Sequence, residues 1–265
     1  MKIPVIDKEG KKVSDFEFDT NTLVRDDIFK KAYLAENSLF FQSYGSDPKA
    51  GKKQVINLSK RRKAFRTTYG RGGSRTPKKV MWARGTQHRY VGAWVSQAVG
   101  GRRAHPPKAE KKTIKTMNNK EWMKALLTGV SASFDKVSVE ANGQRVPEQY
   151  PVVLDSSVET LAKTSDFKSF LEKAGFSSEL ERLEVKKVRA GKGTMRNRKY
   201  KTKRGPLVVV SNLENPLFKA ARNVQGFDVV TPDLLMVQDF GMSEKPGRAV
   251  LFTKAALEEF SEVMN

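Results

Sequence analysis

The sequence predicts an α/β fold, in which a mostly parallel sheet is covered by helices on both faces and one very long basic internal loop extends from the domain. Short apolar strands alternate with amphipathic helices through residues 152–265, which is the pattern of a parallel sheet. Residues 48–109 interrupt the pattern with 62 positions that include no Asp or Glu. We therefore expect a single globular α/β domain formed by residues 1–47 and 110–265, and an extended loop at 48–109.

The first elements are two short strands and a helix. The strands are Val5–Ile6 and the alternating VSDFEF of residues 13–18, with a turn at DKEGK between them. Asn21 or Thr22 is the expected N-cap of the helix. Its buried face has apolar residues three or four positions apart, at Ile28, Ala32, Ala35 and Leu39.

After the first helix ends near Tyr44, the apolar periodicity stops until Asn118 or Asn119 can cap a second helix. Beyond it, the expected strands are Val152–Leu154, Leu207–Val210, Phe227–Val230 and Ala249–Phe252. LVVV at 207–210 has no polar residue, so it is expected to be buried on both faces. The expected helices are one capped by Ser165 and closed by Gly175, a charged one over Ser178–Val188, one opened by Pro216, a short one started by Asp233, and a last one capped by Thr253.

The charge of the chain is concentrated in two segments. The totals are 50 Lys or Arg against 29 Asp or Glu, a net charge of +21. Residues 48–109 contain 17 of these cations and residues 185–213 contain 10, with no acidic residue in either. The remaining 23 basic residues are outnumbered by the 29 acidic ones. Two intensely basic segments on a slightly acidic body indicate a polyanionic partner, most commonly nucleic acid.

Composition excludes several classes of chemistry. The chain has no cysteine and only two histidines, which excludes disulfides, thiolate zinc sites, cysteine nucleophiles and three-histidine metal sites. Neither a signal-peptide core nor an 18-residue apolar stretch occurs, so we expect a cytoplasmic protein without a membrane span. GRGG at 70–73 and GKG at 191–193 match no nucleotide-binding pattern, and no cofactor is expected. Four aspartates near strand ends lack a second catalytic group and are interpreted as structural: Asp155, Asp228, Asp233 and Asp239.

Single aromatic residues lie between the basic residues of the first basic segment, 48–109. They are Phe65, Tyr69, Trp82, Tyr90 and Trp94. Cations neutralise phosphates, aromatic rings stack on unpaired bases, and glycines allow close approach, so this mixture suits structured RNA better than duplex DNA. A flexible basic tail is the simpler alternative, but plain tails rarely contain two tryptophans. No carboxylate lies near His88 or His105 in sequence, so we expect both to stack on RNA or bond to it rather than act as general bases.

The second basic segment is read as another phosphate-facing surface, because ten like charges without a counter-anion would destabilise a free surface. The predicted RNA-binding side chains of both segments are Arg61, Arg62, Arg66, Tyr69, Arg71, Arg75, Lys78, Lys79, Trp82, Arg84, His88, Arg89, Trp94, Arg102, Arg103, His105, Arg189, Lys192, Arg196, Arg198, Lys199, Lys201, Lys203 and Arg204.

Three stretches resemble one family. They are GRGGSRTPKK at 70–79, AVGGRRAHPPKAEKK at 98–112 and RAGKGTMRNRKYKTKRGPLVVV at 189–210. Together they resemble the universal large-subunit ribosomal protein L-four family in its archaeal and eukaryotic form, over nearly the whole chain and in order. The absence of a long basic extension after Asn265 favours the archaeal type.

The resemblance implies a structural constituent of the large ribosomal subunit, cytoplasmic and not an enzyme, which supports subunit assembly and translation. It implies a loop that threads ribosomal RNA, with Lys78 and Lys79 near its tip and Arg102, Arg103 and His105 on the returning arm. The implied tip, at the wall of the polypeptide exit tunnel, is Tyr69, Gly70, Arg71, Gly72, Gly73 and Arg75. The implied partners are ribosomal RNA, neighbouring large-subunit proteins and the nascent polypeptide, without membrane or small-molecule substrate. The rival hypotheses are an RNA-modifying enzyme with a basic lid and an architectural protein that prefers duplex DNA.

Overall fold

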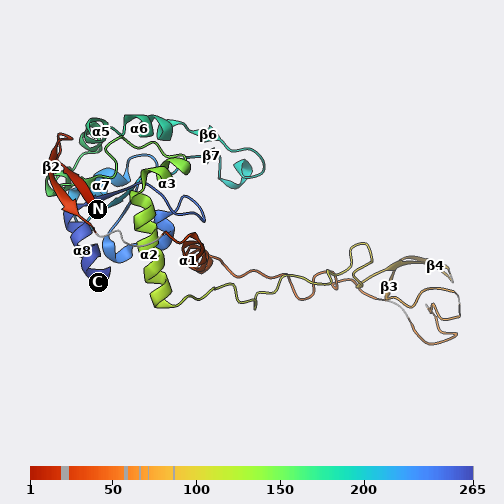
Figure 1. The fold of residues 1–265 in the computed structure, drawn as a ribbon. Coiled ribbons are helices and arrows are strands. Elements are labelled where there is room, and N and C mark those ends of the chain that lie inside the picture. The colour runs from red at the N-terminus through yellow and green to blue at the C-terminus, as the bar shows by residue number, and fades with distance from the viewer. Residues whose placement is uncertain (19–23, 57–58, 66, 71, 86, 265) are drawn as a thin grey trace. The chain divides into compact units, whose positions relative to one another are not determined.

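The computed structural model describes residues 1–265 apart from 19–23, 57–58, 66, 71, 86 and 265 (Figure 1). The chain divides into two compact units. Met1–Phe40 together with Ile114–Asn265 form the first, which we call the sheet unit. Phe41–Thr113 form the second, which we call the basic unit. In the described parts of the chain, no helix is both long and apolar enough to span a membrane.

The sheet unit is built on a six-stranded mixed sheet in the order β2-β1-β5-β10-β8-β9. The strands are β1 (Lys2–Ile6), β2 (Lys12–Glu17), β5 (Val153–Leu154), β8 (Leu207–Val209), β9 (Asp228–Val230) and β10 (Val250–Thr253). β1, β5, β10, β8 and β9 are parallel neighbours, and β2 pairs with β1 in the antiparallel sense. The predicted parallel-rich α/β fold is therefore confirmed, with an antiparallel strand at one edge.

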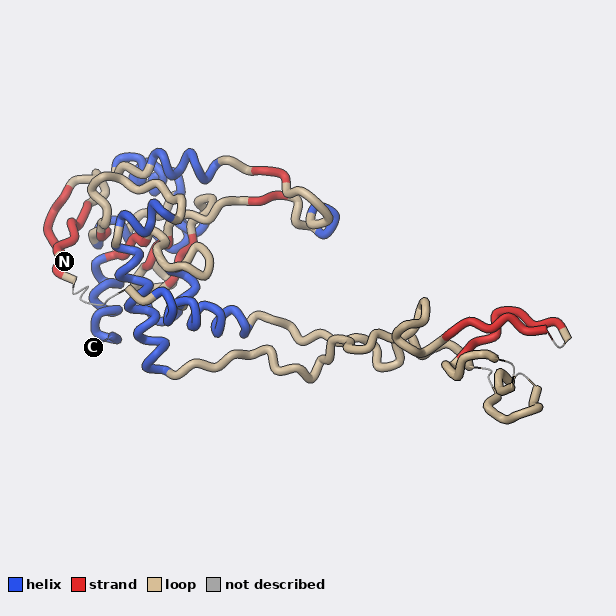
Figure 2. The backbone as a smooth tube through the Cα atoms, turned by 45° about the vertical axis from the view of Figure 1, so that its right-hand side comes forward, coloured by secondary structure: helices blue, strands red, loops and turns tan. Residues whose placement is uncertain are grey.

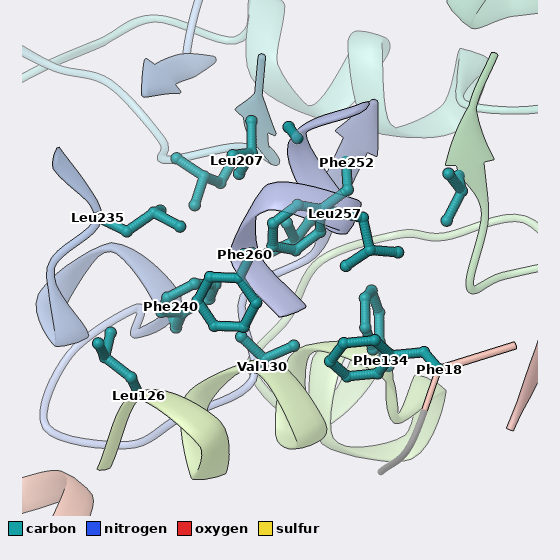
Figure 3. Close-up of a cluster of buried hydrophobic side chains, with 14 of the residues drawn as sticks. Phe18, Leu126, Val130, Phe134, Leu207, Leu235, Phe240, Phe252, Leu257 and Phe260 are labelled. Atoms are coloured by element: carbon teal, nitrogen blue, oxygen red, sulfur yellow. The ribbon is translucent and has the colours of Figure 1, made fainter. Parts of the chain in front are cut away.

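Hydrophobic clusters cover both faces of the sheet. Along β8 and β10, Val209 and Phe252 belong to one cluster, and Val208 and Leu251 belong to the other. Successive strand residues point to opposite faces, so strands covered on both sides must be apolar at every position, as LVVV is. Figure 3 shows the first cluster, where Phe134, Phe252 and Phe260 surround Leu257.

Helices supply the outer side of each cluster, and Figure 2 shows them packed around the strands. The first cluster draws on α1 (Asp26–Leu39), α2 (Asn119–Phe134), α8 (Lys254–Met264) and the 3-10 turn η3 (Val237–Phe240). The second draws on α3 (Lys136–Ala141), α4 (Ser156–Glu159), α5 (Thr164–Lys173), α6 (Ser177–Glu184) and α7 (Pro216–Arg222). A further 3-10 turn, η2, covers Pro232–Leu234 and contains Asp233, where a short helix is expected.

Several helix ends follow the sequence rules. Asn118 is at the N-cap position of α2, and Pro216 is the first residue of α7. Thr253 Oγ1 accepts a hydrogen bond from the Ala256 amide at 3.4 Å, next to the start of α8. Gly175 follows α5 with φ +87°, a conformation that L side chains rarely adopt.

Other helix ends differ from the expectation. Ser165 is not an N-cap, because α5 already begins at Thr164 and the Ser165 hydroxyl donates to the Asp166 carboxylate instead. The charged helix α6 ends at Glu184 rather than Val188, since Lys187–Val188 pairs as a strand with Tyr200–Lys201. The expected caps Asn21 and Thr22 lie outside the described residues, and α1 begins at Asp26.

Candidate nucleic-acid interface

The basic unit contains an antiparallel hairpin of β3 (Lys78–Arg84) and β4 (Gln87–Gly92), drawn as the red pair within this unit in Figure 2. The apolar periodicity of the sequence did not predict these strands. A bulge at Met81 shifts the pairing from Val80 with Tyr90 to Trp82 with Arg89. An extra residue breaks the two-residue alternation of β3, which hides the strand from pattern reasoning.

Aromatic rings gather on one side of this hairpin. The His88 ring lies edge-on to Phe65, with centroids 5.3 Å apart, and 5.8 Å from the Tyr90 ring. His88 and Tyr90 are half-buried, whereas Gln87 and Arg89, which flank His88 in β4, are exposed. This alternation along β4 is the signal that could have revealed the strand. The imidazole of His88 is thus held in a protein cluster, while Arg89 and the 51% exposed Trp82 face solvent.

The described residues of the expected tip, 69–75, fold onto their own loop. The Arg75 guanidinium lies 5.8 Å from the centroid of the Tyr69 ring, a cation–π arrangement. Lys78 Nζ donates to the Ser74 carbonyl at 2.6 Å. The next residue, Lys79, is half-buried. Arg66 and Arg71, two of the predicted RNA-binding residues, lie outside the described residues.

Two segments, 43–56 and 94–113, run side by side in the basic unit as its outgoing and returning arms (Figures 1 and 2). The Trp94 indole donates to the Gln54 carbonyl at 2.9 Å, and the Gln54 amide donates to the Gly100 carbonyl at 3.3 Å. At Gly51 the approach is so close that a Cβ would lie 2.6 Å from the backbone of Arg102. The arms are therefore joined by side-chain-to-backbone hydrogen bonds and by a close backbone approach that requires a glycine at 51.

The cations of the basic unit are largely left without carboxylate partners. Where the structure describes this unit, Lys53 with Asp47, at 2.6 Å, is its one ion pair. That hydrogen bond lowers the pKa of Asp47 and raises the pKa of Lys53. The exposed predicted residues of this unit are Arg61, Arg62, Arg75, Trp82, Arg84, Arg89, Trp94, Arg102, Arg103 and His105. Such a surface attracts an external polyanion.

A second basic hairpin lies in the sheet unit, and we call residues 186–203 the basic hairpin. It consists of β6 (Lys187–Val188), the 3-10 turn η1 (Thr194–Arg196) and β7 (Tyr200–Lys201). Its turn is closed by the Arg196 and Arg198 amides, which both donate to the Gly193 carbonyl, at 3.1 and 3.0 Å. The Arg189 guanidinium donates across the turn to the Arg198 carbonyl at 3.1 Å. These hydrogen bonds close the turn although Arg189, Arg196 and Arg198 carry like charges.

The cations of the basic hairpin point outward apart from Arg189, which is half-buried. Lys186 and Lys199 place their ammonium groups 4.6 and 5.5 Å from the centroid of the Tyr200 ring, a pairing that sequence reasoning missed. The exposed predicted residues are Lys192, Arg196, Arg198, Lys199, Lys201 and Lys203.

Arg204 differs from the other predicted residues because its guanidinium is already occupied. It bonds to the Asp228 carboxylate at 3.1 Å and to the Gly241 carbonyl at 3.0 Å, and it pairs with Asp239 at 3.6 Å. Arg248, fully buried, also pairs with Asp228, at 2.7 Å. Asp228 and Asp239 therefore pair with arginines of the fold, in line with their interpretation as structural residues. Arg204 is less available to a ligand than the exposed cations of the basic hairpin.

The network around Arg248 shifts the pKa values of its members. Burial lowers the pKa of Arg248 to about 10. Burial also raises the pKa of Asp239. Burial would also raise the pKa of Asp228, but the charges of Arg248 and Arg204 outweigh this effect, so the pKa of Asp228 is lowered. The charges of these arginines and aspartates neutralise one another inside the protein, whereas most cations of the basic unit have no such partner.

Comparison with known proteins identifies the family of this chain. A profile of the "Ribosomal protein L4/L1 family" matches residues 12–263. The "Large ribosomal subunit protein uL4" of Nanoarchaeum equitans is 38% identical over 264 residues, covering 99% of this chain and 98% of the relative. The protein of the same name from Saccharolobus islandicus (strain M.14.25 / Kamchatka #1) is 33% identical over 97% of this chain and 93% of its own length. The chain therefore belongs to the ribosomal protein L4/L1 family, as an archaeal-type ribosomal protein and not an enzyme.

Proposed function

We propose that this chain is a structural component of the large ribosomal subunit in the cytoplasm, where it binds ribosomal RNA through the basic unit and the basic hairpin. The family membership supports the assignment to the large subunit. The RNA contacts are supported by one observation above all. The cations of residues 48–109 are mostly exposed and lack internal carboxylates, since their next acidic neighbours in sequence are Asp47 and Glu110.

Binding to RNA provides the missing counter-charge. Each Lys or Arg that meets a phosphate releases a condensed counterion, which makes the affinity steeply salt-dependent. Exposed aromatic groups such as Trp82 can stack on unpaired bases, and sequence-tolerant stacking is typical of RNA-binding surfaces. Because cations and aromatic groups lie on both hairpins, we propose that one protein chain bridges separate RNA segments and thereby supports assembly of the subunit and translation.

The loop tip is proposed to line the polypeptide exit tunnel. This step rests on the resemblance of GRGGSRTPKK to the tip sequence of the family. Its glycines at 70 and 72 have φ +76° and +68°, and a Cβ at either would meet nothing within 4 Å. An exposed turn of small residues is suited to a wall that a nascent polypeptide passes. Neighbouring ribosomal proteins would be the remaining partners.

Replacement of the cations of the basic hairpin tests the RNA-binding proposal. The test variant changes Lys192, Arg196, Arg198, Lys199 and Lys201 to Gln. The control variant carries five Lys→Gln changes at exposed positions in or next to helices of the sheet unit, at Lys163, Lys168, Lys173, Lys219 and Lys254. Binding of the full chain to large-subunit ribosomal RNA is measured by filter retention over a salt series.

If the five residues meet phosphates, the slope of log affinity against log salt decreases in magnitude by roughly 3.5 to 4.5, at about 0.7 to 0.9 for each lost contact. The control variant should change the slope far less. An unchanged slope in the test variant would show that the basic hairpin does not meet phosphates. For the whole proposal, the chain should sediment with the large subunit of a cell extract and be released by ribonuclease. Sedimentation away from the subunit before ribonuclease treatment would refute it.

A further inference from the structure

A cavity of about 620 Å³ lies between the outgoing and returning arms of the basic unit. Its lining includes Tyr44, Arg103, His105, Pro107, Glu110 and Lys111. Next to the cavity the two arms are joined by a backbone hydrogen bond, which the Ser46 amide donates to the Pro107 carbonyl at 3.2 Å. At Gly45 the arms lie so close that a Cβ would be 2.8 Å from the Ala109 nitrogen. The cavity is therefore defined by the chain before any ligand arrives.

The side chains around this cavity match the parts of a nucleotide. Tyr44 is 74% exposed and His105 is also exposed, so each presents a flat ring to a ligand. Arg103 and Lys111 supply positive charge for a phosphate. Rings that stack on a base beside cations that meet its phosphate are the usual elements of single-stranded RNA recognition. A cavity of this volume lies within the common range for small-ligand sites, about 300 to 1,000 Å³.

Glu110 is the unusual member of the cavity. Asp47, the other acidic residue of the basic unit, is explained by its bond to Lys53. The Glu110 carboxylate has no hydrogen-bond or ion-pair partner among the described residues, although Arg103 and Lys111 line the same cavity. A carboxylate next to RNA repels phosphates. A surface that binds RNA by positive charge alone would therefore not be expected to contain Glu110. Its two oxygens can instead accept hydrogen bonds from a base.

Among the four bases, guanine has two adjacent donors on its Watson–Crick edge, N1–H and the N2 amino group, which match the two oxygens of a carboxylate. Single-stranded RNA is commonly read along this edge. We infer that the cavity binds an unpaired guanine nucleotide, with Tyr44 and His105 at the faces of the base, Glu110 at its Watson–Crick edge, and Arg103 and Lys111 at the phosphate. This inference rests on the proposed RNA-binding function and adds base specificity to it.

The test uses the full chain and short fluorescent oligouridine probes with one central guanosine, inosine or adenosine. Inosine differs from guanosine only by the missing N2 amino group. Affinities are measured by fluorescence anisotropy at one fixed salt concentration. A bidentate base contact gives discrimination of roughly five- to a hundredfold, so the guanosine probe should bind at least about fivefold more tightly than the other two.

Three variants separate base reading from general electrostatics. Glu110→Gln should abolish the preference for guanosine over inosine. Tyr44→Ala should weaken binding of the guanosine probe about tenfold through lost stacking. Glu148→Gln, the same charge change at an exposed position of the sheet unit, should leave the preference intact.

Two results would overturn the inference. One is equal affinity of the wild-type chain for the three probes. The other is an equal gain in affinity for all probes in Glu110→Gln, which would show that Glu110 acts only as a repulsive charge. If either occurs while ribosomal RNA is still bound with a steep salt dependence, the guanine site fails and the proposed function stands. If the wild-type chain itself shows no salt-dependent binding to ribosomal RNA, the proposed function is refuted as well.

Discussion

The arginines in the interior of the sheet unit and those of the basic unit have opposite environments. In the sheet unit, Arg248 is fully buried and its guanidinium bonds to the Gly205 carbonyl at 2.7 Å and to Asp228 at the same distance. Arg182, with a side chain 10% exposed, binds both oxygens of the buried Glu179, at 2.7 and 2.6 Å. In the basic unit, Arg102 and Arg103 are exposed and have no ion-pair partner among the described residues.

This difference separates two uses of the same side chain. A buried charge is tolerated only where hydrogen bonds and a counter-ion replace its water, so the buried arginines of the sheet unit contribute to the fold. Exposed and unpaired cations contribute little to folding and remain available to a partner. The two kinds of arginine should therefore respond differently to mutation: changes of the buried, paired arginines should alter stability, and changes of the exposed cations in the basic unit and the basic hairpin should alter binding.

Removal of most of the basic unit is the strongest test of this comparison. Replacing residues 48–109 by a short Gly/Ser linker should reduce the affinity for ribosomal RNA at low salt by at least about 100-fold, because 17 cations are lost. The sheet unit keeps both of its hydrophobic clusters, so thermal unfolding followed by circular dichroism should stay cooperative. Loss of the cooperative transition would show that the sheet unit cannot fold without the basic unit.

Removal of a buried arginine should have the largest effect on stability. Arg248→Met leaves the Gly205 carbonyl without its partner and the Asp228 carboxylate with Arg204 alone, and should reduce the free energy of unfolding by about 3 to 5 kcal/mol. Arg103→Met in the basic unit is the matched control and should change it by less than about 0.5 kcal/mol. Urea unfolding measures both variants. Equal losses in the two variants would contradict the division between stabilising and binding arginines.

Asp228→Asn should have a smaller effect that depends on pH. Its side chain is 48% exposed, so solvent weakens its pairing with Arg248, and a loss of about 1 to 2 kcal/mol is expected at neutral pH. The pKa of Asp228 is lowered in the folded state, so its ionised form stabilises the protein above the ordinary pKa of an aspartate. That contribution is lost as pH falls through the folded-state pKa.

The difference in unfolding free energy between wild type and Asp228→Asn should accordingly shrink in acid. Urea unfolding between pH 7 and pH 3 measures it. Asp239, whose pKa is raised, contributes with the opposite sign, so only the difference between the two proteins isolates Asp228. A constant difference across this pH range would mean that the charge of Asp228 does not contribute to stability.

The sequence predicts the elements of the sheet unit well because burial leaves a pattern. LVVV at 207–210 and the helix face at Phe167, Phe170 and Leu171 are apolar because they pack in the second hydrophobic cluster. The β3–β4 and β6–β7 hairpins were not predicted, since strands without a packed face need no apolar alternation and the bulge at Met81 disturbs what remains.

The partners of individual side chains were harder to predict than the elements. Arg204 belongs to a run of cations in sequence, yet its carboxylate partner Asp228 lies 24 positions later and reaches it only through the pairing of β8 with β9. The cavity that joins Tyr44 to Glu110 likewise depends on two arms that are far apart in sequence. Charge patterns locate an interface, but contacts between distant segments decide which cations it contains.

The smallest expected effect concerns the contact between the arms, and it tests whether the basic unit has internal order of its own. Gly51 has φ +72°, and an added Cβ would lie 2.6 Å from the Arg102 backbone. Gly51→Ala should therefore separate the arms and increase the rate of trypsin cleavage after Lys49, Lys52 and Arg102 several-fold. The free energy of unfolding of the sheet unit should change by less than about 0.5 kcal/mol.

Gly70→Ala is the matched control. Gly70 has nearly the same backbone conformation, φ +76°, but a Cβ there would meet nothing within 4 Å. Both substitutions carry the conformational cost of a side chain in the left-handed region, about 1 kcal/mol, and only Gly51→Ala adds a collision with the opposite arm. If digestion of the arms accelerates equally in both variants, backbone strain alone explains the effect. Faster cleavage in Gly51→Ala alone would show that the arms are held together by this contact, so that the basic unit keeps its cations in place before an RNA partner binds.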